Sequence, residues 1–328
     1  MANFSDIVGY ADVIAQLKSV IARKRFSHAY ILCGEDGSGK KLLAEAFAKT
    51  LLCEKGGEDA CGQCISCKQA ESQNHPDIRR VVREKASLSV KEIREQIVSD
   101  AQIKPYSSEY KVYIIEDAQT MTEEAQNALL KTIEEPPEYA VFFLLTTQKE
   151  SLLPTILSRS VSLLLPPVAS REIAEFLMKK RGVPDYLAES AAAFSGGIIG
   201  RAVRFSESED FARMRSEILH IVKNINHMSM AELMESVKLL TTQKDNIPEY
   251  LNMLTVWYRD VLLFKATQDG SMLYFREQEE ETRRQARECS YEKLQRILDA
   301  IEQLKTRMRS NVNTETAMEL LLLDMKED

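Results

Sequence analysis

Four cysteines near the start of the chain have the spacing of a metal site. Seven, two and two residues separate them, in the order Cys53, Cys61, Cys64 and Cys67. Tetrahedral Zn²⁺ prefers soft ligands, and a two-residue spacing lets neighbouring thiolates reach the same ion. A site of four thiolates has no open coordination position, so we expect its role to be structural. Disulfides, free thiols and an iron–sulfur cluster, which takes similar ligands, are the alternatives.

A second, glycine-rich motif could hold phosphates. It reads Gly34-Glu35-Asp36-Gly37-Ser38-Gly39-Lys40 and fits the first seven positions of the P-loop. Its glycines let backbone N–H groups surround phosphates, and a helix N-terminus adds a favourable dipole. Lys40 would reach the β- and γ-phosphates. A glycine-rich turn that binds nothing is the alternative. The candidate nucleotide-binding positions here are Gly34, Gly37, Ser38, Gly39, Lys40 and Lys41.

Two departures from the P-loop pattern argue against efficient ATP hydrolysis by this chain. The eighth position, where Ser or Thr holds Mg²⁺ through its hydroxyl, is Lys41, and an ammonium repels the cation. The acidic pair after a predicted strand is Glu116-Asp117, whereas the usual order is Asp and then Glu. Each carboxylate is displaced by about one methylene, and in-line attack is sensitive to errors of about 1 Å. Nucleotide binding without hydrolysis stays open.

The motifs follow short apolar segments that predict the buried strands of a parallel sheet. We expect strands at residues 30–33, 77–83, 112–115, 141–145 and 161–165. We expect helices at residues 11–24, 40–52, 90–103 and 123–133. Continuous apolar strands separated by helices indicate a parallel sheet covered on both faces, and ligands lie beyond the C-terminal strand ends. The glycines, the acidic pair and Thr146-Thr147 all fall there.

The rest of the chain predicts two helical parts. Pro166-Pro167 ends the sheet pattern, and we expect no strand after about residue 208. The fold class is therefore α/β plus all-α. We expect an α/β domain at 1–167, which includes the cysteine module at 53–67, then a small helical domain at 168–208 and a larger one at 209–328.

The composition is that of an ordinary globular protein and excludes several classes. Of 328 residues, 44% are apolar and 28% charged, which rules out a collagen-like or disordered chain. The net charge of −7 argues against a protein that coats nucleic acid alone, because phosphate neutralisation needs clustered Lys and Arg. There is no apolar run of about 18 residues and no secretory signal, so we expect a cytosolic protein. A reducing cytosol favours metal over disulfides at the cysteines.

The other reactive side chains give no catalytic set. The histidines have no partners that suggest a triad or a metal spacing, and two cysteines stand alone, so we interpret all of them as structural. These residues are His28, His75, His220, His227, Cys33 and Cys289.

Taken in order, these segments resemble the bacterial clamp-loader subunits of the AAA+ class. The resemblance extends over residues 1–205 and is weaker over the helical remainder. Besides the P-loop and the cysteine insert, it is carried by Phe4-Ser5-Asp6-Ile7-Val8-Gly9, Ser27-His28-Ala29-Tyr30, His75-Pro76-Asp77, Ala128-Leu129-Leu130-Lys131-Thr132-Ile133-Glu134-Glu135-Pro136-Pro137 and Leu157-Ser158-Arg159. The family's motor subunit has an intact P-loop, so this chain looks like a subunit that is not the motor.

The resemblance implies a place in a larger machine. It implies a pentameric loader of DNA polymerase III that opens a ring-shaped sliding clamp and places it on primer–template DNA. The partners would be the motor (gamma/tau) and delta subunits, in the replisome at the nucleoid and not at a membrane. The helical domain at 168–208 would be the lid, and that at 209–328 the collar through which loader subunits oligomerise.

The resemblance also implies roles for individual residues. The family's serine-arginine motif corresponds to Ser158-Arg159, and its arginine reaches into the ATP site of the neighbouring motor subunit. A guanidinium there stabilises charge on the γ-phosphate, an effect worth about 10³–10⁵ in rate in other enzymes. The arginine of the lid corresponds to Arg201, where the local spacing differs. Thr146 or Thr147 corresponds to the position that senses γ-phosphate.

The leading hypothesis is a non-hydrolysing ring subunit that donates Arg159 in trans and carries a structural Zn²⁺. The first alternative is an ATP-hydrolysing AAA+ motor that uses Mg²⁺, similar to gamma/tau. The second is a zinc-dependent DNA-binding module. The acidic balance, the close cysteine spacing and the lack of a recognition helix argue against that module.

Overall fold

The computed structural model describes residues 3–83, 85–243, 246–270, 273–307 and 314–326. The chain divides into two compact units. The first comprises residues up to 172 together with 197–200, and the second comprises 173–196 and the residues from 201 onward. No helix in the described ranges combines the length and apolar character needed to cross a membrane.

The first unit is built on a parallel five-stranded sheet. Its strands are β1 (Ala29–Cys33), β2 (Ile78–Val81), β3 (Lys111–Ile115), β4 (Ala140–Thr146) and β5 (Val161–Leu164). The strand order is β2-β3-β4-β1-β5, and all neighbours pair in parallel. Because the strands are parallel, their C-terminal ends meet at one edge of the sheet. The glycine-rich loop follows β1 at that edge, and Glu116 follows β3.

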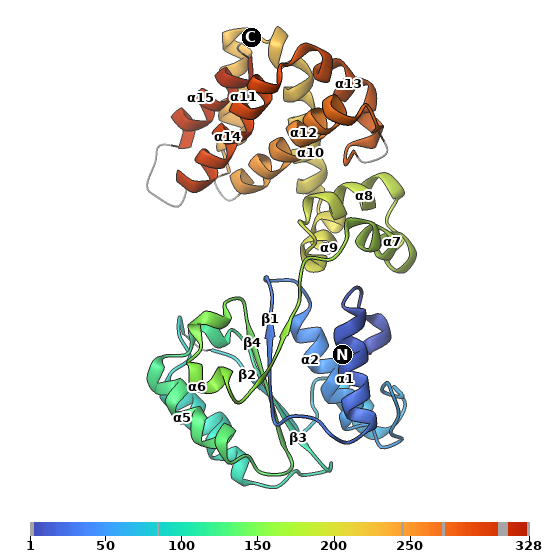
Figure 1. Cartoon of the computed structure of the whole chain (residues 1–328), viewed down its shortest axis with the longest axis vertical. Coiled ribbons are helices and arrows are strands. Elements are labelled where there is room, and N and C mark those ends of the chain that lie inside the picture. Colours follow the sequence, from blue (N-terminus) through green and yellow to red (C-terminus); the bar gives the residue numbers. More distant parts are fainter. Residues whose placement is uncertain (1–2, 84, 244–245, 271–272, 308–313, 327–328) are drawn as a thin grey trace. The chain divides into compact units, whose positions relative to one another are not determined.

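Helices cover both faces of this sheet (Figure 1). One face packs on α1 (Ala11–Ala22) and α2 (Lys40–Leu51), and the other packs on α5 (Glu123–Glu134). Alternate strand residues point to opposite faces, so both must be apolar. The residues towards α1 and α2 are Tyr30, Leu32, Val112, Ile114, Val141, Phe143 and Leu145. Those towards α5 are Ile31, Tyr113, Ile115, Phe142 and Leu144.

Short helices complete the first unit. They are α3 (Ile65–Glu71), α4 (Val90–Ile93), α6 (Pro154–Leu157) and the 3₁₀ turns Phe4–Asp6, Asp100–Gln102, Ala118–Thr120 and Lys149–Ser151. The predicted helix at 90–103 is not regular, because a π-type turn occupies Arg94–Val98. The Ser99 N–H donates to Arg94 O at 2.9 Å, and the wider turn keeps Ile93, Ile97 and Ala101 all buried.

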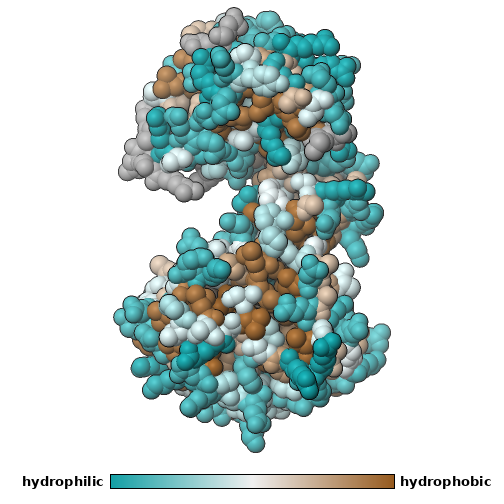
Figure 2. Space-filling model, in the orientation of Figure 1, coloured by the Kyte–Doolittle hydropathy of each residue, from teal (hydrophilic) through white to brown (hydrophobic). Residues whose placement is uncertain are grey.

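The sequence prediction was wrong about the burial of the last strand. A strand is present at Val161–Leu164, but it lies at the edge of the sheet and pairs only with β1. Val161 is 36% exposed and Leu164 is 64% exposed, while Leu163 is buried. Apolar residues also reach the surface of the first unit in Figure 2. An apolar run cannot reveal which strand is at the edge, because the order of strands is set by tertiary packing.

The described residues of the second unit form helices and the loops that connect them, with no strand. Its helices are α7 (Ser170–Arg181), α8 (Asp185–Phe194), α9 (Ile199–Glu207), α10 (Glu209–Asn224), α11 (Met230–Thr241), α12 (Ile247–Thr267), α13 (Glu279–Glu288), α14 (Tyr291–Arg307) and α15 (Thr314–Lys326). Aromatic rings join the expected lid to the C-terminal helices. Phe211 lies 5.6 Å from Phe194 and 4.4 Å from Phe205, measured between ring centroids. The division into three domains stays a prediction.

Candidate functional site

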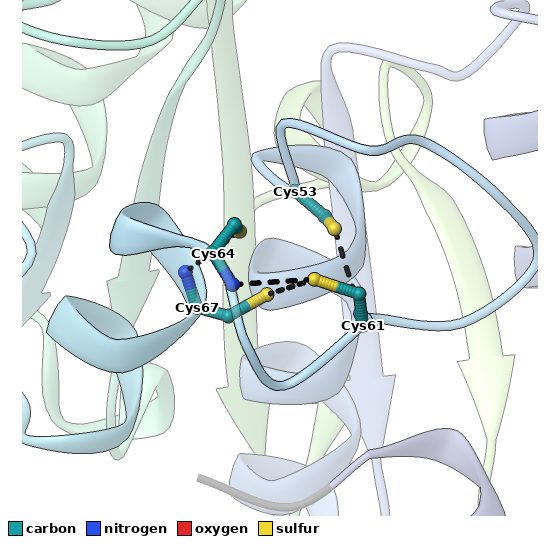
Figure 3. Close-up of side chains that lie close together, drawn as sticks. All are labelled: Cys53, Cys61, Cys64 and Cys67. Carbon is teal, nitrogen blue, oxygen red and sulfur yellow. Dashed lines mark hydrogen bonds between the residues drawn. The ribbon is translucent and has the colours of Figure 1, made fainter.

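The four clustered cysteines converge in space, as Figure 3 shows. Cys53 follows α2, Cys61 lies in the insert, Cys64 is the N-cap of α3 and Cys67 lies in its first turn. Their four Sγ atoms lie within 4.8 Å of one another, and the sulfurs of Cys61 and Cys67 are 3.9 Å apart. These distances exceed a disulfide bond of about 2 Å, and all four thiols are free. The donor set fits one tetrahedral Zn²⁺.

Backbone N–H groups point at the sulfurs and favour thiolates. Those of Gln63 and Cys64 donate to Cys61 Sγ at 3.5 and 3.4 Å, and that of Cys67 donates to Cys64 Sγ at 3.4 Å. The two donors at Cys61 lower the pKa of its thiol to about 6. Burial raises the pKa of the Cys67 thiol, which a nearby cation would offset. Cys61 is therefore favoured as a thiolate, the form that binds a metal ion, whereas Cys67 alone favours its neutral thiol.

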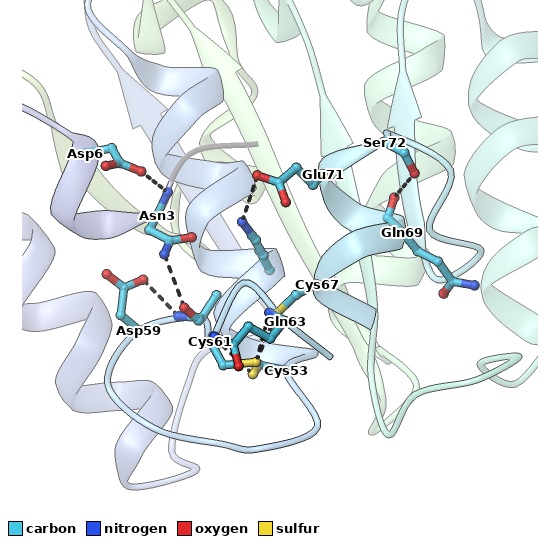
Figure 4. A network of polar contacts seen from close by, with 12 residues as sticks. Asn3, Asp6, Cys53, Asp59, Cys61, Gln63, Cys67, Gln69, Glu71 and Ser72 are labelled. Carbon is cyan, nitrogen blue, oxygen red and sulfur yellow. Dashed lines mark hydrogen bonds and ion pairs between the residues drawn. The ribbon is translucent and has the colours of Figure 1, made fainter. Parts of the chain in front are cut away.

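Asp59 ties the cysteine insert to the N-terminal turn. Figure 4 shows Asp59 and Asn3, which both contact the loop of the insert. The Asp59 carboxylate accepts from the backbone N–H groups of Phe4 and Ser5, both at 3.1 Å, and from that of Ala60 at 2.9 Å. The Asn3 side chain donates to Ala60 O at 3.2 Å. The bonds from Asn3, Phe4 and Ser5 connect residues more than fifty positions apart. The insert is thus part of the first unit's framework. No motif or spacing in the sequence pointed to this role of Asp59.

His75 lies beside the cysteine cluster but is not part of it. Its Nε2 is 3.0 Å from Ser66 Oγ, and its Nδ1 accepts from the Asp77 N–H at 3.1 Å. Both ring nitrogens are engaged, which agrees with the structural interpretation from sequence. The Asp77 carboxylate accepts from the backbone N–H groups of Tyr106 and Ser107. Burial raises the pKa of Asp77, but these hydrogen bonds outweigh it and the pKa lies below its usual value.

The glycine-rich loop after β1 uses glycine at two positions with a left-handed backbone. Gly37 and Gly39 have φ angles of +86° and +96°, a region that side chains other than glycine rarely adopt. The Lys40 ammonium, however, donates to loop carbonyls, with Gly34 O at 2.6 Å and Glu35 O at 3.0 Å. The loop carbonyl of Gly37 also accepts from the Gly200 N–H at 2.9 Å. Ser38 is buried within the loop.

The two residues that depart from the ATPase pattern are joined to each other. The Lys41 ammonium lies 2.7 Å from Glu116 Oε1 in an ion pair. Asp117 has a left-handed backbone, with φ of +50°, and its carboxylate lies 3.4 Å from Arg83 Nε. The acidic pair is therefore split, because one carboxylate faces the loop lysine and the other faces Arg83. The Lys41 ammonium therefore pairs with the strand-end carboxylate that supports Mg²⁺ in P-loop ATPases.

The remaining predicted nucleotide contacts have protein partners. The Thr146 hydroxyl is buried, donates to Gln148 O at 3.0 Å and accepts from the Gln148 N–H at 3.1 Å. A γ-phosphate would have to displace these bonds. Arg201 belongs to the second unit, where its Nη1 donates to Ser195 O at 3.5 Å. The nucleotide role of Arg201 stays a prediction.

Arg159 lies on the surface of the first unit, after α6. Its Nη1 donates to Thr155 O and to Ser158 Oγ, both at 3.2 Å. Its Nη2 lies 3.1 Å from Glu134 Oε1, at the end of α5. The arginine side chain is 42% exposed. The Glu-Glu-Pro-Pro sequence indicated the end of α5. The sequence alone did not predict that Glu134 would contact Arg159.

A parallel sheet of this order, with a glycine-rich loop after β1 and a four-cysteine insert, defines a P-loop protein of the AAA+ type. A solved structure supports this fold: a DNA polymerase III gamma subunit-related protein from Thermotoga maritima is similar with a TM-score of 0.50. The alignment covers 95% of this chain and 98% of that one at 19% identity, so the likeness concerns the fold.

Sequence comparison gives the family. The model of the family described as DNA polymerase III, delta subunit, matches residues 9–169, and that of its C-terminal part matches 210–327. The chain is 30% identical to subunit delta' of DNA polymerase III from Bacillus subtilis, over 96% of this chain and 95% of that protein. It is 29% identical to the tau subunit of the same organism, over 80% of this chain and 50% of tau. The chain belongs to the DNA polymerase III delta' family of clamp-loader subunits.

Proposed function

We propose that this delta' subunit hydrolyses no ATP itself and acts in trans on a neighbouring motor subunit of the clamp loader. In this proposal Arg159 enters the motor's ATP site and Ser158 supports it. The motor (gamma/tau) and delta subunits are its partners. The sliding clamp and primer–template DNA are reached through the complex, during DNA replication.

The ion pair between Lys41 and Glu116 is the observation that carries the absence of hydrolysis. A P-loop ATPase needs a hydroxyl at the first of these positions and a free acid at the strand end to hold Mg²⁺. Here an ammonium lies 2.7 Å from the acid. A divalent cation would meet a like charge and would have to compete for Glu116. The bonds of Lys40 to Gly34 O and Glu35 O also argue against hydrolysis, because a nucleotide phosphate would have to displace them.

The exposure of Arg159 supports its action in trans. Its guanidinium is always charged and lies on the surface, with contacts on one side to α6 and on another to Glu134. A planar guanidinium is well suited to phosphate oxygens and can stabilise the charge that develops during phosphoryl transfer. The residue could therefore serve a phosphate that belongs to another chain.

The cysteine cluster supports the proposal indirectly. Cys53, Cys61, Cys64 and Cys67 would hold a Zn²⁺ that supplies no chemistry but cross-links the insert. Through Asp59 the insert is hydrogen-bonded to the N-terminal turn of the first unit. A ring subunit that presents one arginine to a neighbour needs a rigid frame.

The test is the steady-state ATPase activity of the reconstituted loader, with clamp and primed DNA, with Arg159→Ala in this subunit. We expect a drop of tenfold or more while gel filtration shows intact assembly. Arg181→Ala is the matched control, because Arg181 is 48% exposed and lies 3.1 Å from one carboxylate, that of Glu207. Equal rates for wild type and both variants would contradict the trans role.

A second candidate function is an ATP-hydrolysing motor, which the 29% identity to the tau subunit favours. The isolated chain would then hydrolyse Mg·ATP, and Lys40→Ala would abolish the turnover. The delta' proposal expects no turnover above that of the Lys40→Ala variant. Salt-dependent binding of DNA by the isolated chain would instead support a zinc-dependent DNA-binding module.

A further inference from the structure

Arg159 is held on two sides by different elements. Its Nη1 donates to Thr155 O and Ser158 Oγ, both within the turn formed by α6. Its Nη2 forms an ion pair with Glu134, which is the last residue of α5. An arginine side chain has several rotatable bonds, and a single exposed contact would leave most of its freedom. Contacts to both edges fix the plane of the guanidinium.

The elements that hold Arg159 are fixed to each other by a buried glutamine. Gln126 of α5 is buried, and its Nε2 donates to Ser151 O at 3.1 Å. Its Oε1 accepts from the Leu153 N–H at 2.8 Å, just before α6 begins. The end of α5 and the turn that carries Arg159 are therefore parts of one frame. The position of Glu134 relative to Arg159 is therefore set by this frame.

The ion pair between Arg159 and Glu134 is also weak enough for a partner to break it. Both side chains are 42% exposed, and exposed ion pairs are screened by solvent and salt. A triphosphate on a neighbouring chain carries more charge and can accept from the guanidinium in two places. Glu134 can thus order the arginine before a partner arrives without retaining it when phosphate is present.

We propose that Glu134 is a positioning residue that pre-orders the guanidinium of Arg159 for the partner's ATP site. The inference rests on the proposed function of Arg159 in trans. Ordering the side chain in advance lowers the entropic cost of reaching the transition state. It therefore acts on the rate of hydrolysis once ATP is bound, and it leaves the binding of ATP by the motor subunit unchanged.

The experiment compares ATPase kinetics of the reconstituted loader, with clamp and primed DNA, for four forms of this subunit besides wild type. These are Glu134→Gln, Glu135→Gln, Arg159→Ala and the double variant of Glu134→Gln with Arg159→Ala. Glu135 is the matched control, since it is the next residue along, is also exposed and forms the cap of the same helix. We expect Glu134→Gln to lower kcat about three- to tenfold with KM for ATP changed less than twofold. Glu135→Gln should match wild type, and the double variant should match Arg159→Ala.

The outcomes separate this inference from the proposed function. If Arg159→Ala slows the loader and Glu134→Gln does not, the positioning role is wrong and the role of Arg159 stands. A faster rate for Glu134→Gln would mean that the carboxylate restrains the arginine, and would overturn positioning. A further loss in the double variant would show that Glu134 acts through another contact. No loss with Arg159→Ala would overturn both, and gel filtration of each complex checks that assembly is intact.

Discussion

The ammonium of Lys41 lies 2.7 Å from the carboxylate of Glu116. Lys41 is the second residue of α2, the helix after the glycine-rich loop, and Glu116 follows the parallel strand β3. In P-loop ATPases the two positions cooperate through Mg²⁺, and here a lysine takes the place of the cation. Asp117 does not replace Glu116, because its carboxylate lies beside Arg83. The two residues that depart from the P-loop ATPase pattern in the sequence, Lys41 and Glu116, thus contact each other in the structure.

Lys41→Thr should not create an ATPase. The substitution restores a hydroxyl at the eighth P-loop position and frees Glu116. It leaves Asp117 in its left-handed backbone conformation beside Arg83, so the acid that would orient the attacking water stays misplaced. The measurement is Mg·ATP turnover by the isolated chain. We expect Lys41→Thr to equal the double variant of Lys40→Ala with Lys41→Thr, which has lost the lysine that reaches phosphates.

A tenfold higher rate for Lys41→Thr than for that double variant would contradict the role given to the acidic pair. It would mean that Lys41 alone blocks a competent site. Thermal unfolding of each variant provides the control for folding, since Lys41 is 48% exposed and its replacement should change stability little.

Removal of zinc should loosen the insert before it affects the sheet. Without metal, the buried thiol of Cys67 and the neighbouring sulfurs lose their common ligand, and the loop between Cys53 and Cys61 loses its anchor. We expect one zinc per chain by elemental analysis. Chelation should speed tryptic cleavage after the exposed Lys55 at least tenfold, while cleavage after the exposed Lys131 on α5, which packs on the sheet, stays constant.

The controls for the zinc prediction are two cysteine variants. Cys33→Ser should keep its zinc, because Cys33 lies at the end of β1 and outside the cluster. Cys64→Ser should lose zinc and show fast cleavage after Lys55 without chelator. Unchanged cleavage in a chain shown to be free of metal would refute a structural role for the site.

A buried acid in the second unit should make its stability depend on pH. Asp260 is fully buried, and its Oδ2 accepts from the N–H groups of Tyr274 and Phe275, both at 2.8 Å. Burial raises the pKa of Asp260 to about 6, although the two N–H donors and Arg259 oppose the rise. The folded state therefore holds the proton up to a higher pH than the unfolded state. Stability is greatest below the unfolded pKa and falls as pH rises through 6.

Asp260→Asn should remove this dependence. From pH 5 to pH 8 we expect the free energy of unfolding of the wild type to fall by about 1 kcal/mol relative to the variant. Trp257 is the single tryptophan of the chain, is buried and lies one turn before Asp260 in α12, so its fluorescence reports on this unit. Urea titrations at the two pH values give the difference. A gap between wild type and variant that stays constant with pH would refute the assignment.

The strands and their C-terminal ends could be predicted because their signal is local. An apolar run such as Val112-Tyr113-Ile114-Ile115 is buried on both faces and is followed by Glu116-Asp117, which marks the ligand edge. The cysteine spacing is local for the same reason. The exposure of β5 was not predictable, since an edge strand and a central strand can have similar sequences.

The sequence by itself determined the fold class, the four-thiolate cluster and the defects at Lys41 and Glu116, because each depends on residue type and short spacing. Tertiary structure alone decided that these two residues pair with each other. It also decided that Asp59 ties the insert to the N-terminal turn and that Glu134 meets Arg159. These contacts join segments that are far apart in the chain, and their geometry arises only when the sheet, its helices and the insert have packed together.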